Sequence, residues 1–495
     1  MMSRTNTVSG VRLVLGYSGV IIMIIGAIVM LPLLFLLPYP EERDVAKFFI
    51  VPGVCTLMVG YLFSFFVRGH GKGHVDKGQS AVIVVTSWVV AVFSCAIPFY
   101  LTGDYTMTQA VFESTSGWTT TGLTVVDVEN TPHLFLIHRS LTMFFGGIGL
   151  VLVTLSVLPN SYGMSLYRAE GHSDNMLPNL LRSSRIILIL YSGYIIGGIL
   201  LYVAFGMPWF DALNHSICAV ATGGFSTKAL SIGFYHSVPI EMVSVILMIL
   251  GSTNFLAHLC FLSGKPKRFF AHCEMHLTML IYAVSVPLAT YFLISQVGET
   301  FFDSFRSAAF HMISALSTTG YQIVPAFNGW PSTLLLLLTL LMLVGGHAGS
   351  TAGGIKQVRV YIMLKSLIWY FRDTLSSGRI VRADHIQKPT EKQLVTAEMK
   401  NETFIFLQVY LLVFLAGSFF LCMKGFDLKH ALFEYASAMG GVGLSAGVTS
   451  PDAAPPVLWA LSLGMFVGRL EIFVVITAFL KLLRSMLALG TEDIS

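Results

Sequence analysis

Long apolar segments separated by short polar loops occupy most of the chain. The first, from about Val14 to Leu37, is long enough to cross a bilayer whose hydrocarbon core is about 30 Å thick. It is also longer than the apolar region of a cleaved signal peptide, so we expect a retained membrane helix. A second span is expected over about residues 46–67. The later spans are apolar on every side and show no helical period, so internal repeats locate them better.

Four segments of the chain align without gaps. They are AVFESTSGWTTTGLT (110–124), ALNHSICAVATGGFS (212–226), AAFHMISALSTTGYQ (308–322) and ALFEYASAMGGVGLS (431–445). Each has Glu or His three residues after its first alanine (Glu113, His215, His311, Glu434) and glycine nine residues later (Gly122, Gly224, Gly320, Gly443). A Met-x-x-Gly signature ends 24 to 27 residues beyond each of these glycines, at Gly146, Gly251, Gly345 and Gly468. Two matched spacings in four units predict a fourfold repeat.

Each unit is interpreted as a span, a short helix, a glycine loop and a second span. The short helices have only about a dozen residues, too few to cross the bilayer, so we expect them to be re-entrant. Irregular backbone at that depth is tolerated only where it lines a water-filled cavity or is buried in protein. With two extra spans at the N-terminus, the pattern predicts an all-α polytopic membrane protein of ten spans and four re-entrant helices around a central pore.

The predicted parts follow from the repeat boundaries. They are two N-terminal transmembrane helices (1–76), pore repeat 1 (77–160), pore repeat 2 (161–264), pore repeat 3 with a broken gating helix (265–372), and pore repeat 4 after a cytoplasmic linker (373–495).

One predicted span is interrupted. The run LLLLLTLLMLV from Leu334 meets ten residues of which five are glycine. They are Gly345, Gly346, His347, Ala348, Gly349, Ser350, Thr351, Ala352, Gly353 and Gly354. By register they lie about 25 residues past a repeat glycine, just below the glycine loops, and we expect an unwound segment that projects into the conduction path as a gate. The alternative is a helix kink around close packing.

Composition places the chain in the membrane, since 55% of its residues are hydrophobic, 11% are charged and the mean hydropathy is +0.74. The net charge of +4 does not indicate nucleic-acid binding, because the basic residues gather in loops two spans apart. These are Arg68, Lys72 and Lys77; Arg168, Arg182 and Arg185; Lys265, Lys267 and Arg268; and Arg372, Arg379 and Arg382. The positive-inside rule then places these loops and both termini in the cytoplasm. The scattered cysteines form no CxxC pair and predict neither a disulfide framework nor a zinc site.

The glycine loops are suited to binding a cation that has lost its water. Rings of backbone carbonyls can replace a hydration shell, and glycine enters the required conformations without steric penalty. The candidate filter residues are Thr120, Thr121, Gly122, Thr222, Gly223, Gly224, Thr318, Thr319, Gly320, Gly441, Val442 and Gly443. These loops contain no carboxylate, which favours a large monovalent cation over calcium. Glycines in membrane helices are also common packing residues, and this remains the alternative.

Polar residues beside the loops have several interpretations. Glu113, His215, His311 and Glu434 are expected to support the loops by hydrogen bonds, or the two acids attract cations, or all four are simply satisfied polar residues. Arg469 is expected to face the pore below the filter, beside the gate, as a cationic barrier, because charges inside membranes are expensive and usually functional. An ion pair with Glu471 is the alternative.

The repeats, the stretch GGHAGSTAGGIK, the later GRLEIF and the two extra N-terminal spans together resemble the TrkH/KtrB/HKT superfamily of potassium transporters, and the TrkH type in particular. The resemblance covers essentially the whole chain. It implies potassium uptake across the bacterial inner membrane, a lipid environment, a homodimer, and a TrkA-like cytoplasmic nucleotide-binding protein that gates the pore. Potassium is then the transported ligand, with no covalent cofactor and no enzymatic activity. In this superfamily serine at the first filter position accompanies sodium transport, so Gly122 favours potassium.

Some alternatives stay open at this point. A sodium- or proton-coupled symporter or a weakly selective channel is possible, although symporter folds usually show twofold inverted repeats. An intramembrane metalloenzyme would use HCEMH (272–276), which lacks the glutamate position of HExxH. The second filter glycine is Gly224 by register, but Gly223 is adjacent, and the fourth loop has Gly441 and Val442 where two others have threonines. The polar stretch from Arg372 to Glu402, together with the loops at 68–79 and 263–275, is the expected docking surface for a partner. The alternative for each of them is a plain solvated linker.

Overall fold

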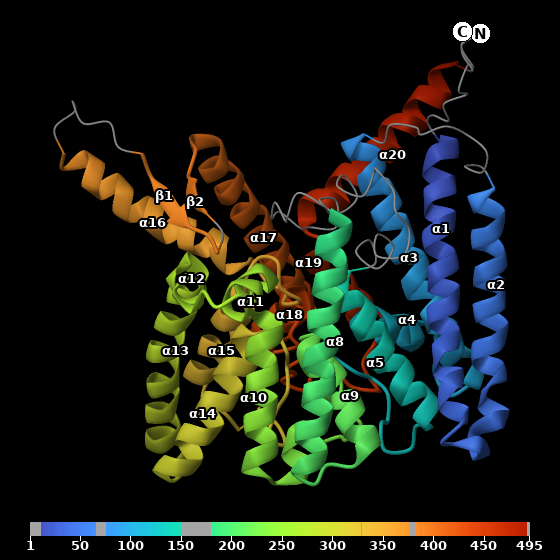
Figure 1. The fold of residues 1–495 in the computed structure, drawn as a ribbon, viewed down its shortest axis with the longest axis horizontal. Coiled ribbons are helices and arrows are strands. Elements are labelled where there is room, and N and C mark those ends of the chain that lie inside the picture. Colours follow the sequence, from blue (N-terminus) through green and yellow to red (C-terminus); the bar gives the residue numbers. More distant parts are fainter. Residues whose placement is uncertain are drawn as a thin grey trace. The chain divides into compact units, whose positions relative to one another are not determined.

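The computed structural model describes residues 11–65, 76–149, 180–327, 329–376, 383–389 and 391–492, and these are mostly helical (Figure 1). Arg68, Lys72, Arg168, Arg379 and Arg382, on which part of the charge argument depends, lie outside the described residues. The chain forms two compact units. The first comprises Met1–Thr119, Val125–Leu190 and Leu470–Ser495, and the second comprises Thr120–Thr124 and Tyr191–Arg469.

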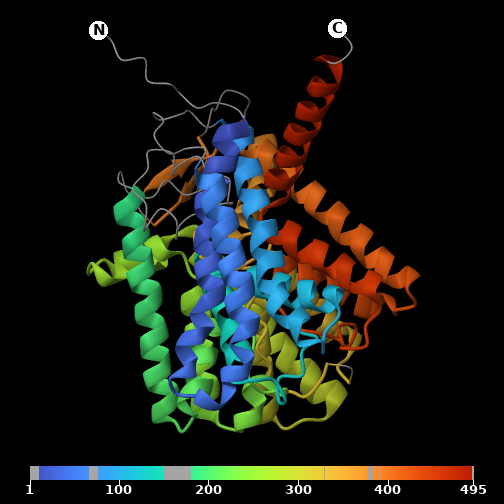
Figure 2. The same ribbon diagram turned by 90° about the vertical axis from the view of Figure 1, so that its right-hand side faces the viewer.

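The first unit is built on a closely packed pair of N-terminal helices (Figure 2). Its elements are α1 (Val11–Met30), the 3-10 helices η1 (Leu31–Leu36) and η2 (Pro40–Val45), α2 (Lys47–Ser64), α3 (Lys77–Thr102), α4 (Met107–Trp118), α5 (His133–Ile148) and α20 (Ile472–Glu492). Helices α1 and α2 approach through glycine, because a methyl group added at Gly19, Gly26 or Gly60 would overlap the backbone of the other helix. Such small-residue contacts are the usual means of helix association in membranes.

The second unit contains the remaining elements. They are α8 (Leu180–Ala204, which begins in the first unit), α9 (Trp209–Val220), η3 (Ser231–Tyr235), α10 (Val238–Ser252), α11 (Phe255–Leu262), α12 (Pro266–Ala271), α13 (Cys273–Phe292), the π-helical turn η4 (Leu293–Val297), α14 (Phe301–Leu316), α15 (Ser332–Val344), α16 (Gln357–Thr374), β1 (His385–Gln387), β2 (Lys392–Leu394), α17 (Ala397–Met423), α18 (Leu428–Gly440) and α19 (Pro455–Arg469).

The prediction of a polytopic helical membrane protein is confirmed. Six of the described helical segments are long and apolar enough to cross a membrane, and these contain α1, α2, α3, α8, α13 and α17. Helices α10 and α11 form a further apolar pair with a bend of 107°, and α19 and α20 pass the same test together. Helix α15, with 13 residues, is shorter than a full span because the chain unwinds after Val344. The total of ten spans stays a prediction.

The four short helices of the repeats are present at the predicted places. They are α4 with 12 residues, α9 with 12, α14 with 16 and α18 with 13. The side chains of Thr106 and Thr300 cap the first turns of α4 and α14, and Pro208 precedes α9 in an extended conformation, which fixes where each helix begins. That these helices re-enter the membrane stays a prediction.

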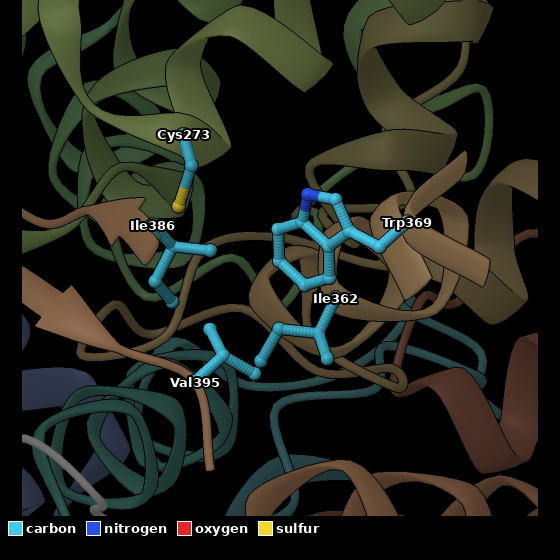
Figure 3. Packing of buried hydrophobic residues seen from close by; sticks show 5 residues of the cluster. All are labelled: Cys273, Ile362, Trp369, Ile386 and Val395. Atoms are coloured by element: carbon cyan, nitrogen blue, oxygen red, sulfur yellow. The ribbon is translucent and has the colours of Figure 1, made fainter. Parts of the chain in front are cut away.

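The polar stretch between α16 and α17 contains a small hairpin, which the sequence analysis did not predict. Strands β1 and β2 pair antiparallel, with Ile386 opposite Gln393. Five buried side chains from α13, α16 and the hairpin segment pack together, as Figure 3 shows, and they are Cys273, Ile362, Trp369, Ile386 and Val395.

Asp384 links this hairpin by ion pairs to the helix before it and the helix after it. Its carboxylate accepts hydrogen bonds from Arg372 in α16 at 2.9 Å and from Lys400 in α17 at 2.7 Å. Burial raises the pKa of this carboxyl, but the bonds and charges of Lys400 and Arg372 outweigh it, so the pKa lies below its usual value.

Candidate ion pathway

The four glycine loops share one backbone conformation. The residue two positions before each repeat glycine has a positive φ, with values of 53° at Thr120, 52° at Thr222, 56° at Thr318 and 66° at Gly441. The repeat glycines also have positive φ, with values of 95° at Gly122, 70° at Gly224, 79° at Gly320 and 101° at Gly443. A threonine in this region is uncommon, so its occurrence in three loops indicates a required geometry. Gly224, rather than Gly223, has the conformation of the other repeat glycines.

The shared conformation also explains the departure in the fourth loop. Its first position is Gly441, which adopts the left-handed backbone at no steric cost, whereas threonine pays for it. Glycine in place of threonine at position 441 therefore keeps the backbone conformation of the loop and avoids its strain.

The four loops close into a ring within the second unit. A methyl group added at Gly122 would collide with the carbonyl oxygen of Gly223, and one at Gly224 with that of Thr319. In the same way, Gly320 lies against the carbonyl of Val442, and Gly443 lies against the carbonyl of Thr121. Each repeat glycine therefore packs on the backbone carbonyl of the next repeat, and the fourth repeat packs on the first.

The side chains of the middle residues point away from any accessible surface. Thr121, Thr319 and Val442 are all completely buried, and the hydroxyl of Thr319 pairs with that of Ser317 at 2.9 Å. By contrast, Gly122, Gly224 and Gly443 are only half-buried. The accessible part of the ring is therefore backbone, and valine in place of threonine at position 442 leaves it unchanged.

The Glu or His residue at the equivalent position of each repeat hydrogen-bonds the chain just after the glycine loop. The carboxylates of Glu113 and Glu434 accept the backbone N–H of Val125 at 3.1 Å and of Ala446 at 2.9 Å, each twelve residues further on. In the third repeat the N–H of Ile323, also twelve residues further on, donates to Nε2 of His311 at 3.2 Å.

The histidines can replace glutamate because of their orientation. Nδ1 of His215 lies 2.8 Å from the carbonyl of Asp211, and Nδ1 of His311 lies 2.8 Å from that of Ser307. Since a carbonyl can only accept, Nδ1 carries the proton and Nε2 is left as an acceptor, as a carboxylate oxygen is. Nε2 of His215 thus accepts from the hydroxyl of Ser226 at 2.9 Å. Of the three interpretations given above, hydrogen-bonded support of the loops is the one these contacts favour.

Three of the Met-x-x-Gly glycines are contact points between helices. A methyl group at Gly146 would collide with the carbonyl of Trp118, at Gly251 with that of Val220, and at Gly468 with that of Met439. Each of these carbonyls lies four residues before a repeat glycine. In these three repeats the helix that follows the glycine loop therefore packs on the end of the repeat's own short helix. Gly345 differs, because a methyl group there would meet the carbonyl of Gly353 within its own loop.

The segment from Gly345 to Gly354 is not helical. Helix α15 ends at Val344, Gly345 turns the chain with a φ of 72°, and α16 begins only at Gln357. Gly349 and Gly354 also have positive φ, and the side chains of His347, Thr351 and Ala352 are buried. We call residues 345–354 the intramembrane loop, after the position that the sequence predicts for them.

The intramembrane loop packs against the short-helix ends of three repeats. The hydroxyl of Thr351 lies 3.0 Å from the carbonyl of Val220 and 3.1 Å from the hydroxyl of Thr222. The N–H of Gly353 donates to the hydroxyl of Thr318 at 2.8 Å. In the fourth repeat Gly353 lies so close to the carbonyl of Gly440 that a methyl group would not fit. The loop thus contacts the glycine loops of the second, third and fourth repeats where each follows its short helix.

The other side of the intramembrane loop is held by Asn254, Glu274, Thr278 and Gln357, of which the sequence analysis considered only Glu274, as part of HCEMH. The amide of Asn254 donates to the carbonyl of Ala348 at 2.5 Å, and the N–H of Ala348 donates to Glu274 at 2.7 Å. The hydroxyl of Thr278 lies 2.8 Å from Nε2 of His347 and donates to Gln357 at 2.6 Å. Polar residues inside apolar segments were the available signal, since buried polar groups need partners.

Arg469, at the end of α19, contacts the intramembrane loop directly. Its guanidinium donates to the backbone carbonyl of Thr351 at 2.8 Å. The hydroxyl of Thr351 accepts a hydrogen bond from the hydroxyl of Thr222, so Arg469 and the second glycine loop both contact Thr351.

Comparisons with known proteins agree with this geometry. The family profile for TrkH, described as a cation transport protein, matches residues 53–488. The Trk system potassium uptake protein TrkH of Halomonas elongata is 28% identical over 487 residues, covering 94% of this chain and 98% of that protein. The TrkH protein of Salmonella typhimurium is 27% identical over 479 residues, covering 93% of this chain and 96% of that protein. The crystal structure of the potassium transporter TrkH from Vibrio parahaemolyticus superposes with a TM-score of 0.82 at 26% identity, covering 94% of this chain and 98% of that chain.

Proposed function

Because the chain belongs to the TrkH family of cation transport proteins, we propose that it takes up potassium ions across the bacterial inner membrane through the ring of its four glycine loops. The chain is a membrane transporter and not an enzyme. Relatives named as potassium uptake proteins cover nearly its whole length, which supports potassium as the ion.

The observation that carries this proposal is the closed order of the loops. Four repeat glycines each pack on the backbone of the next loop, and the glycines of the first, second and fourth loops remain partly accessible. Carbonyl oxygens arranged around an axis can replace the water shell of a potassium ion. Helices α9, α14 and α18 end directly before their loops, so their negative dipole ends favour a cation there.

We assign gating to the intramembrane loop and Arg469. The loop is held against Thr222, Thr318 and Gly440, and movement away from them would free the space below the filter loops. The positive charge of Arg469 next to this loop would oppose a passing cation. A TrkA-like nucleotide-binding partner acting on a homodimer would shift the loop, and the hairpin segment between α16 and α17 is the surface we propose for its docking.

The test is ion flux into liposomes containing the purified protein, with potassium and sodium in competition. In Gly122→Ser the added side chain must displace the carbonyl of Gly223, so we expect potassium selectivity over sodium to fall about tenfold, or about 1.4 kcal/mol. Gly425→Ser is the matched control, because Gly425 has the same φ of 95° but nothing within 4 Å of an added methyl group.

The outcomes separate the competing functions. Selectivity lost in Gly122→Ser and kept in Gly425→Ser supports the filter and its register. Equal permeability to both ions in all three proteins would contradict the filter. Flux that requires an imposed proton or sodium gradient would identify a coupled symporter instead.

A further inference from the structure

A second cluster of chemically active side chains lies on the side of the intramembrane loop that faces α13. His272, Glu274 and His347 each offer a nitrogen or oxygen atom, and these atoms all lie within 4.8 Å of one another. All three side chains are buried, with exposed fractions of 0%, 4% and 2%. His347 belongs to the loop, whereas His272 and Glu274 belong to the start of α13.

The surroundings orient these side chains. Nδ1 of His272 lies 2.6 Å from the carbonyl of Phe269, so it donates, and Nε2 carries the lone pair. A metal-binding histidine usually donates its second N–H in this way, which fixes the ring and raises its basicity. The hydroxyl of Thr278 donates to Gln357, so Nε2 of His347, 2.8 Å from that hydroxyl, donates to it, and Nδ1 of His347 carries the lone pair. Nδ1 accepts only a long hydrogen bond, from the N–H of Asn254 at 3.4 Å, which a bound metal would replace. The rings of His272 and His347 meet edge to face at 5.3 Å. Glu274 is positioned by the N–H of Ala348.

Two imidazoles and one carboxylate form the ligand set of many zinc sites that keep a fourth position for water. Ligand atoms around tetrahedral zinc lie about 3.4 Å apart, since each bond is about 2.1 Å long. Donor atoms within 4.8 Å therefore reach this geometry by moving about 1 Å towards one another. Magnesium and calcium prefer oxygen ligands, so two ring nitrogens disfavour both.

Two opposing charges act on a cation bound at this site. His272 lies at the N-terminal end of α13, where the partial positive charge of the helix disfavours a cation. The carboxylate of Glu274 in the first turn compensates for this. Exposed Ala271 directly precedes His272 in the chain, so the site lies close to an accessible surface.

We propose that His272, Glu274 and His347 bind one divalent transition-metal ion of the zinc class, which ties the intramembrane loop to the start of α13. Bound metal stabilises the loop in the arrangement described above, against Thr222 and Thr318. It therefore inhibits ion flux, and this second half of the proposal rests on the proposed function.

His276 supplies a matched control. It is the second histidine of HCEMH, lies one turn further along α13, and is exposed, while His272 is buried. A zinc site made of the i, i+4 pair would need both histidines, whereas the proposed site needs only His272. The variants are His272→Gln, Glu274→Gln and His276→Gln, and Glu274→Gln keeps an oxygen that can accept the N–H of Ala348.

The first measurement uses calorimetry to determine how zinc binds to the purified full-length protein without a histidine tag. We expect one zinc ion per chain in the wild type and in His276→Gln. Binding should weaken at least tenfold in His272→Gln and in Glu274→Gln. Equal binding by the wild type and both site variants would overturn the site.

The second measurement is potassium flux in liposomes with added zinc or magnesium. Zinc, but not magnesium, should inhibit the wild type and His276→Gln, and the zinc concentration for half inhibition should rise at least tenfold in the two site variants. Zinc that binds as expected but leaves the flux unchanged would overturn the locking role. If none of the proteins conducts potassium without zinc, and Thr351→Val does not restore conduction, the proposed function fails, while the calorimetry still decides whether the metal site exists.

Discussion

In the first repeat the charge of Glu113 is balanced by Arg139. The Nε of Arg139 lies 2.7 Å from the carboxylate, and the two side chains are 2% and 1% exposed. Glu113 also accepts the N–H of Val125, so the pair fixes the chain directly after the first glycine loop. In the fourth repeat Glu434 is instead surrounded by hydroxyl and N–H donors from Ser445, Ala446 and Thr449.

Removal of one partner from this pair should be costly. In Arg139→Met a buried carboxylate loses its counter-charge, which typically destabilises a protein by about 3–5 kcal/mol. We expect a lower apparent Tm in detergent, measured by tryptophan fluorescence. The double variant Glu113→Gln/Arg139→Met has no buried charge and should recover more than half of the loss. A double variant no more stable than Arg139→Met would contradict this account.

At this scale the sequence predicted which residues are equivalent but not what they do. The spacing of Glu113, His215, His311 and Glu434 identified one position in four repeats. Their partners include backbone N–H groups such as that of Ile323, which every residue type except proline carries, so no sequence pattern marks them. The positive φ that distinguishes Gly224 from Gly223 is likewise a property of the folded backbone.

At the scale of elements, the intramembrane loop is held against the glycine loops by few side-chain contacts, of which those of Thr351 are the most numerous. The hydroxyl of Thr351 lies within hydrogen-bond distance of the carbonyls of Val220 and Gly251, at 3.0 and 2.9 Å, and of the Thr222 hydroxyl. A valine at this position keeps the shape and removes the hydroxyl.

We therefore expect Thr351→Val to weaken the held position of the loop by about 1–2 kcal/mol, which shifts a two-state equilibrium roughly five- to thirtyfold. Potassium flux without a partner protein should rise, as measured in liposomes. Arg469→Ala should act in the same direction, because it removes both a bond to Thr351 and a positive charge. Thr339→Val is the control, since the hydroxyl of Thr339 bonds only within α15, to Leu335. Unchanged flux in both Thr351→Val and Arg469→Ala would contradict the gate.

The short helices and the break after Val344 could be predicted because repeats and glycine runs leave clear signals in the sequence. The hairpin could not. Its strands have three residues each, in a segment rich in charge, and their packing depends on Ile386 and Val395 meeting Trp369 from a helix earlier in the chain. Contacts between short, distant segments leave no local periodicity.

At the scale of the whole molecule, the orientation in the membrane follows from the basic loops. We predict that the segment between α16 and α17, which contains Lys388 and Lys392, lies in the cytoplasm, since positively charged loops stay on that side. Trypsin should cut this segment in inside-out vesicles and leave it intact in right-side-out vesicles, as followed by a C-terminal epitope. Lys228, between α9 and η3, is predicted on the opposite side and should show the reverse pattern. Cleavage of both segments from one side would overturn the predicted topology.

The division of the chain into two compact units could not be predicted from the sequence. Residues Thr120–Thr124 belong to the second unit, although α4 before them and α5 after them belong to the first. The repeat pattern predicts units that are continuous in the chain, because it registers similarity along the sequence and not contacts in space. Two contacts join the segment to the second unit. The carbonyl of Thr121 packs on Gly443, and Gly122 packs on the carbonyl of Gly223.

The cyclic packing of the four loops imposes a condition that no single loop can meet. Around a closed circuit the displacements must sum to zero, so a shift at Gly122 has to be absorbed by the loops of Gly224, Gly320 and Gly443. Residues coupled in this way do not contribute independently. Ion discrimination would then be a collective property of the circuit, shared by quadrants that differ in sequence. The sequences of the four loops can therefore differ only by substitutions that leave each repeat glycine packed on the carbonyl of the next loop.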